Sequence, residues 1–424
     1  MRLLPSLAAL PLLALPQPAL AQVAVADSGD TGWTILCALL VLLAALPGLL
    51  LRQAGLANAR NALSVAAQGL GIAAGVSLAW AIAGYSLAYA PGGPWAGGAA
   101  NLFLGDLATL REGLTIPESA FALFQMSLAI LAACLIAGAL AGRARFGWMM
   151  AFAPLWLLVV YAPVAHWTWG GGWLAQLGTL DYAGGLTIHM TAGFSALALI
   201  LIAGRRRDAA SPAHARLLSL GGSALLWVGW FGTTGGWALG ATDDAAAAIL
   251  NTHLAASAGA LAWALLDRLF AGRASASGMA SGAIAGLVGI SASAALTGPS
   301  GAMLIGLLAA LVCRAAALLL ARMRIDDPAA IVALHGVGGL LGTVMLVPLT
   351  LPSLGGVGFD PGVSVTGLLL TQIIAVAVVA LWAMLGSAIL ALGISIVQPL
   401  RAHESDEAEG LDAAHHGEQG WDFR

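Results

Sequence analysis

The sequence predicts an all-α membrane protein with eleven transmembrane helices, in which an inverted five-helix repeat is followed by a long, tilted last helix. The first observation behind this prediction is composition. Apolar residues make up 60% of the 424 residues and only 9% are charged, against roughly a quarter in an average soluble protein. The second is a series of long apolar runs, and the third is a pair of related segments that open two of them. The composition speaks against soluble enzymes, nucleic-acid binders and disordered scaffolds.

The first 21 residues are predicted to be a secretory signal peptide. Arg2 supplies the positive start, residues 7–15 an apolar core, and Ala19-Leu20-Ala21 a cleavage site of small residues. The alternative, a short first membrane helix, is disfavoured because proline interrupts helices and three fall here: Pro11, Pro16 and Pro18. Cleavage would leave the mature N-terminus outside the cytoplasm.

A membrane-spanning helix needs ~20 mostly apolar residues, and eleven runs of the sequence qualify. They are 33–51, 62–89, 118–141, 146–165, 184–204, 217–236, 246–267, 277–294, 300–321, 330–350 and 364–397. Within a transmembrane domain of residues 22–400, the predicted repeat covers about 33–204 and 217–350. The last run would be about 50 Å long at 1.5 Å per residue. It must therefore tilt in, or protrude from, a hydrocarbon core of about 30 Å.

The basic residues test this topology independently. The sequence has 17 basic residues, all of them arginine, and with the N-terminus outside the great majority fall on the cytoplasmic side. Such an excess is what the positive-inside bias of membrane insertion produces. Residues 401–424 are rich in acidic residues and form a cytoplasmic tail, which composition alone would allow to be disordered. The prediction is a multi-pass protein of the cell (inner) membrane.

Two segments share the pattern Asp-x-Ala-x5-His at the start of an apolar run. Asp181 precedes His189 at the start of the fifth run, and Asp327 precedes His335 at the start of the tenth. These two runs cross the membrane in opposite directions, which is the signature of an inverted-topology repeat. Both aspartates are good helix N-caps, and Pro328 suits the first helical position.

The two histidines are the strongest candidates for function, because an ionisable side chain inside a membrane is costly. Two facing imidazoles can share a proton and pass polar molecules along an otherwise apolar pore. The alternative for a lone histidine is a hydrogen bond to a carbonyl of a neighbouring helix. No cysteine or carboxylate accompanies the pair at ligand spacing, so neither a metal site nor a cofactor is expected.

Aromatic residues beside glycines mark the outer ends of two runs. Trp169 leads into three glycines, which let the backbone turn inward and can place the indole over a pore entrance. The sixth run carries Gly229-Trp230-Phe231-Gly232 near its end and is followed by Trp237, and Phe124 in the third run is a further candidate. An indole face attracts small cations, so these residues favour an aromatic vestibule. The alternative is a belt of tryptophans at the membrane interface.

Five segments of the chain carry a family resemblance. They are Ala165-His166 with Trp169-Gly170-Gly171-Gly172, Leu180-Asp181-Tyr182-Ala183-Gly184-Gly185 with His189, Gly229-Trp230-Phe231-Gly232, Asp326-Asp327-Pro328 with His335-Gly336, and Gly355-Gly356-Val357-Gly358. Together they make nearly the whole mature chain similar to the ammonium transporter family, which includes the Rhesus glycoproteins. The chain most resembles the bacterial ammonium-transporter branch of that family.

The resemblance implies an eleven-helix protomer in a homotrimer within the lipid bilayer, with a separate pore through each protomer. It implies an aromatic cage, containing Trp169, that recruits ammonium at the outer mouth. Asp181 would support that site, Phe124 would close the entrance, and His189 and His335 would line the narrow pore. These roles come from the resemblance and are expectations about the present chain.

The tail also resembles the family. Gly410-Leu411-Asp412 is similar to the family's cytoplasmic C-terminal motif, which packs beneath the trimer and takes part in control by P-II signalling proteins. The resemblance therefore implies a tail that is at least partly ordered, and a P-II protein as a possible partner.

Thr233 and Trp237 depart from the family pattern. The family usually has a second gating phenylalanine at the first position, and at the second a serine that accepts a hydrogen bond from ammonium. Trp237 would then attract the cation through its ring, replace the missing phenylalanine as the gate, or block the pore. The first run also ends in residues 51–55 without the family's usual Tyr-Gly-Gly. We expect a diverged but conducting pore.

The predicted function is ammonium uptake without ATP hydrolysis, because a phosphate-binding loop needs a lysine and all basic residues are arginine. Ammonium would give up a proton at the mouth, and neutral ammonia would pass the histidines. Two alternatives stay open: an ammonium sensor that signals through its tail, and a pore for another small neutral solute. An enzyme is not expected, because no nucleophile–base set appears, and neither is a nucleic-acid partner.

Overall fold

The computed structural model describes residues 25–105, 107–207 and 213–421. The predicted signal peptide, residues 1–21, lies outside them. The described chain is helical and has no β-strand beyond isolated bridges. The prediction of an all-α fold is confirmed.

Each of the eleven predicted apolar runs is helical. The first run corresponds to α1 (Ser28–Leu43), η1 (Ala44–Gly48) and α2 (Leu49–Leu56), and the second to η2 (Ala59–Asn61), α3 (Ala62–Ala79), η3 (Trp80–Gly84) and α4 (Tyr85–Tyr89). The third corresponds to α5 (Glu118–Ala139), and the fourth to α6 (Phe146–Trp156), η5 (Leu157–Tyr161) and α7 (Ala162–Thr168), with α8 (Trp173–Gln176) after it. The fifth corresponds to η6 (Gly185–Met190) and α9 (Thr191–Ala203). A short η4 (Leu102–Leu104) lies in the loop before α5.

The remaining six runs follow in the same way. They correspond to α10 (Arg216–Gly236), α11 (Asp243–Ala271), α12 (Ala276–Ser291), α13 (Pro299–Arg322), η7 (Val332–Val337) with α14 (Gly338–Leu349), and α15 (Val365–Val397). The single-turn η8 (Pro352–Leu354) precedes α15, and the tail forms α16 (Glu404–Glu409) and α17 (Leu411–His416).

Several of these elements join end to end into continuous helices. Nine helices of the described chain are long and apolar enough to cross a membrane: 28–56, 59–89, 118–139, 146–176, 185–203, 243–271, 299–322, 332–349 and 365–397. The other two predicted runs are α10 and the shorter α12. The helices are thus compatible with the predicted series of spans.

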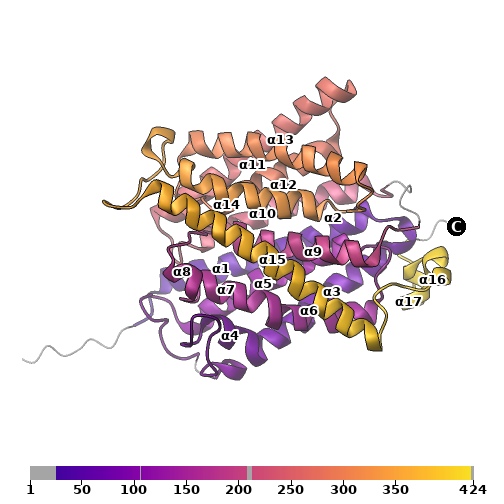
Figure 1. Cartoon of the computed structure of the whole chain (residues 1–424), viewed down its shortest axis with the longest axis horizontal. Coiled ribbons are helices and arrows are strands. Elements are labelled where there is room, and N and C mark those ends of the chain that lie inside the picture. Colours follow the sequence, from indigo (N-terminus) through magenta and orange to yellow (C-terminus); the bar gives the residue numbers. More distant parts are fainter. Residues whose placement is uncertain (1–24, 106, 208–212, 422–424) are drawn as a thin grey trace, which may run out of the picture.

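Helix α15 runs diagonally across the other helices of the bundle (Figure 1). It packs against α6, α9 and α14, and its 33 residues correspond to about 50 Å at 1.5 Å per residue. The tilt predicted from its length is therefore present. Helices α16 and α17 lie at the end of the bundle where α15 finishes (Figure 1); we call this the tail end.

Helix α5 lies at the centre of the bundle. Nearly all of its residues are buried, and it packs against α1, α3 and α9. The three cysteines of the chain, Cys37, Cys134 and Cys313, are buried and unpaired, as expected for residues that only fill space.

Candidate functional site

His189 and His335 lie side by side in the interior. Their Nδ1 atoms are 3.3 Å apart, and their ring centroids are 5.2 Å apart. Both side chains are buried. A hydrogen bond needs one donor and one acceptor, so a single proton lies between the two Nδ1 atoms.

Each histidine lies in a π-helical segment. His189 belongs to η6 and His335 to η7, and each segment continues into an α-helix. The π-helix is rare and is found frequently at functional sites, because it turns one side chain out of the regular α-helical register. Nothing in the local sequence pattern predicted either segment.

The two histidine-bearing helices touch at a pair of glycines. A Cβ atom added to Gly193 would lie 2.2 Å from the backbone nitrogen of Gly336. A side chain at this point would push the helices apart. The two glycines therefore permit the close approach that brings the imidazoles together.

The aspartates of the repeated pattern hold the starts of these helices. The carboxylate of Asp181 accepts hydrogen bonds from the backbone N–H groups of residues 186 and 187, at 3.2 and 2.8 Å. The carboxylate of Asp327 accepts from those of residues 331–333, at 2.8, 2.8 and 3.4 Å. Both carboxylates thus satisfy amides that a helix N-terminus leaves without an intrahelical partner.

Pro328 does not occupy the first helical position, which corrects the prediction. It lies in a turn, and the helix begins only after Ala330, whose φ of 56° is left-handed. The N–H of Ala330 donates to the backbone oxygen of Asp327 at 3.1 Å. Gly184, with φ 92°, occupies the position before η6 that Ala330 occupies before the other helix. The left-handed residue reverses the chain, so each aspartate reaches the helix start from outside the helix.

Asp181 also connects the start of η6 to an aromatic cluster. Its carboxylate accepts a hydrogen bond from the Thr187 hydroxyl at 2.7 Å, and its backbone oxygen accepts one from Trp169 Nε1 at 2.7 Å. Burial raises the pKa of Asp181, and the hydrogen bonds from Thr187 and from residues 184 and 186 oppose that rise. The carboxylate faces interior N–H and O–H groups, and the residue positions the indole of Trp169.

Three aromatic side chains, Phe124, Trp169 and Trp237, meet in what we call the aromatic mouth. The ring centroid of Trp237 is 4.3 Å from that of Trp169 and 6.0 Å from that of Phe124. Thr233 is buried. Neither its hydroxyl nor Trp237 Nε1 has a hydrogen-bond partner among the described residues. The two positions that depart from the family pattern therefore each bring an unpaired polar atom.

Trp230, which the sequence places in the predicted aromatic vestibule, stacks on the histidine pair. Its ring stacks on that of His189, with centroids 4.9 Å apart and an interplanar angle of 23°. The centroid of His335 is 6.3 Å away. Trp230 therefore covers the histidine pair with an aromatic surface.

Ser291 is a site residue that the sequence analysis missed. Its Oγ donates to the backbone oxygen of Leu287 at 2.8 Å and accepts from Trp230 Nε1 at 3.0 Å. His189 Nε2 lies 3.5 Å from the same oxygen. Because the indole N–H can only donate, this arrangement favours a proton on His189 Nε2. His189 Nδ1 is then the acceptor for His335 Nδ1–H.

The tail motif is ordered and packs on the start of α3. The Asp412 carboxylate accepts from the backbone N–H groups of Leu63 and Ser64, at 3.2 and 2.7 Å. Leu411 is buried. Gly410 has φ 109°, and a Cβ there would lie 2.5 Å from the Cβ of Arg60. A disordered tail is therefore excluded for residues 404–416.

Among residues 25–105, 107–207 and 213–421, no group of three or more His, Cys, Asp or Glu side chains could hold a metal ion. In the part of the chain that the structure describes, Trp230 stacks on the histidine pair and the Ser291 hydroxyl lies within hydrogen-bond distance of it. The chemistry available at the pair is therefore proton sharing and hydrogen bonding.

Comparison with known proteins decides the family. The model of the Ammonium Transporter Family matches residues 32–421. The chain belongs to this family. A relative from Bacillus subtilis, an ammonium transporter, is 38% identical over 405 residues, covering 93% of the chain and 98% of the relative. Amt1 of Archaeoglobus fulgidus, also an ammonium transporter, is 35% identical and covers 92% and 99%.

Solved structures agree with this membership of the family. A Sensor Amt Protein superposes with a TM-score of 0.85 at 29% identity, covering 92% of the chain and 98% of that protein. The crystal structure of Mep2 from Candida albicans gives a TM-score of 0.82 at 33% identity, covering 90% and 88%. The predicted resemblance to the family is confirmed.

Proposed function

We propose that the chain transports ammonium across the cell membrane through a pore that passes the His189–His335 pair. The observation that carries the proposal is the 3.3 Å contact between the two Nδ1 atoms in a buried site. A charged ammonium ion cannot enter such surroundings cheaply. The transported form at this point is therefore neutral ammonia, which hydrogen-bonds to the imidazoles as it passes.

The aromatic mouth recruits the cation, which gives up its proton to the water outside before ammonia passes inward. The faces of Trp169 and Trp237 attract ammonium by cation–π interaction, and the unpaired Thr233 hydroxyl supplies an acceptor in place of the family's serine. Phe124 and Trp237 close the way to the histidines until ammonium has lost its proton. Asp181 acts indirectly, because its backbone holds Trp169 and its carboxylate holds the start of η6.

The test measures current on a solid-supported membrane after an ammonium pulse, with the purified chain in vesicles. We expect H189A/H335A to lose selective ammonium flux by about tenfold or more, which corresponds to about 1.4 kcal/mol in the barrier. The matched control is H253A, because His253 is exposed on α11 and lies against Trp227 and Phe231. Undiminished, selective flux in H189A/H335A would overturn the proposal.

A sensor function is the second candidate. It is favoured by the structural likeness to a Sensor Amt Protein, and by Trp237, whose ring contacts those of both Trp169 and Phe124. The two functions are separated by growth on limiting ammonium in a host that lacks ammonium transporters. A transporter restores growth, whereas a sensor leaves the host unable to grow.

Assembly and placement complete the proposal. The chain forms a homotrimer in the inner membrane, with the mature N-terminus outside and the tail in the cytoplasm, where a P-II signalling protein binds. The family membership and the ordered packing of residues 410–412 on α3 support this assignment. The mass of the purified complex tests the trimer, and labelling of a cysteine added after Trp421 in intact cells tests the side on which the tail lies.

A further inference from the structure

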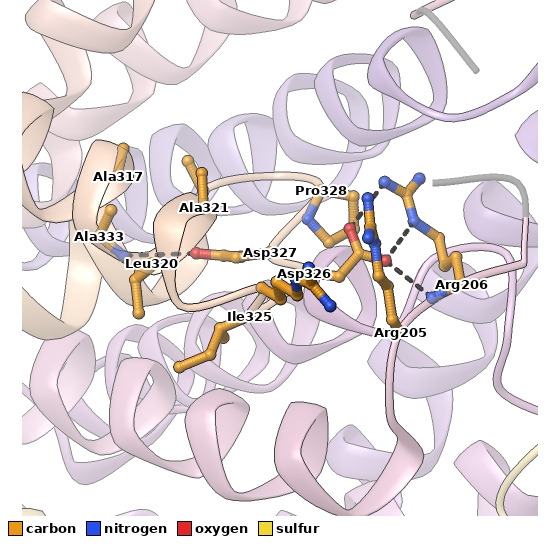
Figure 2. A pocket seen from close by; sticks show the side chains of 12 residues that line it. Arg205, Arg206, Ala317, Leu320, Ala321, Ile325, Asp326, Asp327, Pro328 and Ala333 are labelled. Atoms are coloured by element: carbon orange, nitrogen blue, oxygen red, sulfur yellow. Dashed lines mark hydrogen bonds and ion pairs between the residues drawn. The ribbon is translucent and has the colours of Figure 1, made fainter. Parts of the chain in front are cut away.

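A cavity of about 260 Å³ lies at the tail end, beside the segment that leads into η7. Three arginines and two aspartates line it, together with apolar side chains of α13 and of the segment 325–333: Arg205, Arg206, Arg324, Asp326 and Asp327. In Figure 2, Asp326 lies beside Arg205 and Arg206, while Asp327 points the other way, toward Ala333.

Both carboxylates of this cavity are taken up by internal partners. Asp326 accepts from the backbone N, Nε and Nη2 of Arg206 at 2.9, 2.9 and 3.0 Å, and from Arg143 Nη1 at 3.3 Å. Asp327 binds the amides of residues 331–333. Burial tends to raise the pKa of Asp326, but the hydrogen bonds and charges of Arg206 and Arg143 outweigh it and hold the pKa below its usual value.

Two of the guanidinium groups that line the cavity have no partner among the described residues. Arg205 and Arg324 are exposed at the cavity wall, and neither has an ion pair or side-chain hydrogen bond with any residue that the structure describes. The planar fork of arginine matches the oxygens of a phosphate group with two parallel hydrogen bonds. A cavity that holds unpaired positive charge, while both of its carboxylates are engaged elsewhere, suits an anion of that shape.

We propose that this cavity binds a phosphate group, which Arg205 and Arg324 hold from two different segments of the chain. The group belongs either to a lipid headgroup or to a free phosphate. Ala330 and Ala333 form part of the cavity wall, so the bound group lies against the turn that leads to His335. The residues that line this site include none of the aromatic mouth and neither histidine of the pair.

The test follows the thermal unfolding midpoint of the purified full-length chain in detergent with two probes. The first is sodium phosphate, compared with sodium chloride at equal ionic strength. The second is dioctanoyl phosphatidylglycerol, compared with dioctanoyl phosphatidylcholine. A ligand that binds only the folded state raises its stability in a saturable, concentration-dependent way. We expect a saturable rise with at least one phosphate-bearing probe beyond its comparison compound.

The decisive variant is R205Q/R324Q. Both side chains are exposed, so the fold should tolerate the change, and the half-saturating concentration should rise about tenfold or more, which corresponds to about 1.4 kcal/mol of binding. The variant R205K/R324K keeps the charge but loses the fork, so it should give a smaller rise. The matched control is R268Q/R273Q, which removes two exposed arginines, one in the last turn of α11 and one between α11 and α12, and should bind like the native chain.

The two probes separate the sources of the phosphate group. Saturation by phosphatidylglycerol but not by phosphate identifies a lipid headgroup, and saturation by inorganic phosphate identifies a free anion. The proposal is overturned if neither probe stabilises the native chain beyond its comparison, or if R205Q/R324Q binds as tightly as the native chain.

Discussion

Asp181 and Asp327 occupy equivalent positions in two distant parts of the chain. Each carboxylate binds amides five and six residues further on, and each aspartate lies three residues before one with positive φ. Eight residues after each aspartate comes a histidine of the pair. This shared local geometry supports the proposal of an inverted repeat, because two copies of one structural unit place their histidines face to face.

Replacing either aspartate with alanine should destabilise the start of its helix. In D181A the amides of residues 186 and 187 lose their acceptor, which costs about 1–3 kcal/mol for a buried group left unpaired. D327A should lose a similar amount of stability. Chemical unfolding of each purified variant in detergent measures the two losses. D181N and D327N keep one acceptor oxygen and should lose less, so alanine variants no less stable than the asparagine variants would contradict this account.

Asp327 should also make stability depend on pH. Burial raises its pKa from 3.8 to about 6, with the backbone hydrogen bonds of residues 331–333 opposing the rise. The folded state then holds the proton more tightly than the unfolded state. The protonated Asp327 therefore contributes to the free energy of unfolding below about pH 4, and this contribution is lost as the pH rises through about 6. Its size is roughly 1.4 kcal/mol for each unit by which folding shifts the pKa.

The measurement compares the free energy of unfolding of the native chain and D327N between pH 4 and pH 7. The difference between the two isolates this residue from the other carboxylates. We expect the native chain to lose stability relative to D327N by about 3 kcal/mol across that range. Parallel pH profiles would show that the pKa of Asp327 does not differ between the folded and unfolded states.

The sequence was sufficient to predict the helices and the histidine pair. Hydropathy located every run, because a segment that crosses a membrane must satisfy its backbone internally and can do so as a helix. The repeated Asp-x-Ala-x5-His pattern located His189 and His335, because both copies of the unit keep the same spacing.

The features that sequence reasoning missed depend on contacts between distant segments. Ser291 lies more than a hundred residues from His189, and no local pattern relates the two. The left-handed backbone at Ala330 was missed because alanine seldom adopts it, and the local reading put Pro328 at the helix start instead. The tail appeared disordered by composition alone because its order comes from Asn61, Leu63 and Ser64 of another segment.

Ser291→Ala should affect both stability and transport. The change leaves Trp230 Nε1 and His189 Nε2 without their shared oxygen, at a cost of about 1–3 kcal/mol. It also removes the preference for a proton on His189 Nε2, so the pH profile of the ammonium current should change shape. Chemical unfolding and solid-supported-membrane recordings provide the two measurements.

Ser293→Ala is the matched control for that change. Ser293 follows on the same segment and is buried, but its hydroxyl has no hydrogen-bond partner among the described residues. Its removal should leave the pH profile unchanged. S291T, which keeps a hydroxyl, should restore the native profile. An S291A profile identical to that of the native chain would show that Ser291 only fills space.

Asp412→Ala should release the tail from the bundle. The residue acts as a cap supplied by a distant segment, because its carboxylate accepts from the first amides of α3. Loss of a helix cap costs about 0.5–2 kcal/mol. Hydrogen exchange should therefore speed up in residues 404–416 and at the start of α3. E418A is the control, since Glu418 is exposed, and equal exchange in D412A and E418A would contradict the assigned role.

Trp237→Ser tests whether this tryptophan binds the cation, gates the pore or blocks it. If Trp237 gates and binds ammonium, the variant should show a larger maximal current and weaker apparent affinity. The lost cation–π contact is worth about 0.5–2 kcal/mol, or roughly 2- to 30-fold in the half-saturating concentration. The double variant T233F/W237S restores both residues that the family usually has, and should regain tight apparent affinity.

The contrary outcomes distinguish the remaining roles, because the ring of Trp237 lies against both Trp169 and Phe124. A native chain without current, combined with a conducting W237S, would show that the indole blocks the pore and would favour a sensor. An unchanged half-saturating concentration in W237S would mean that Trp169 alone holds the cation. In that case the close Trp169–Trp237 contact serves packing, and the recruitment role proposed for Trp237 is wrong.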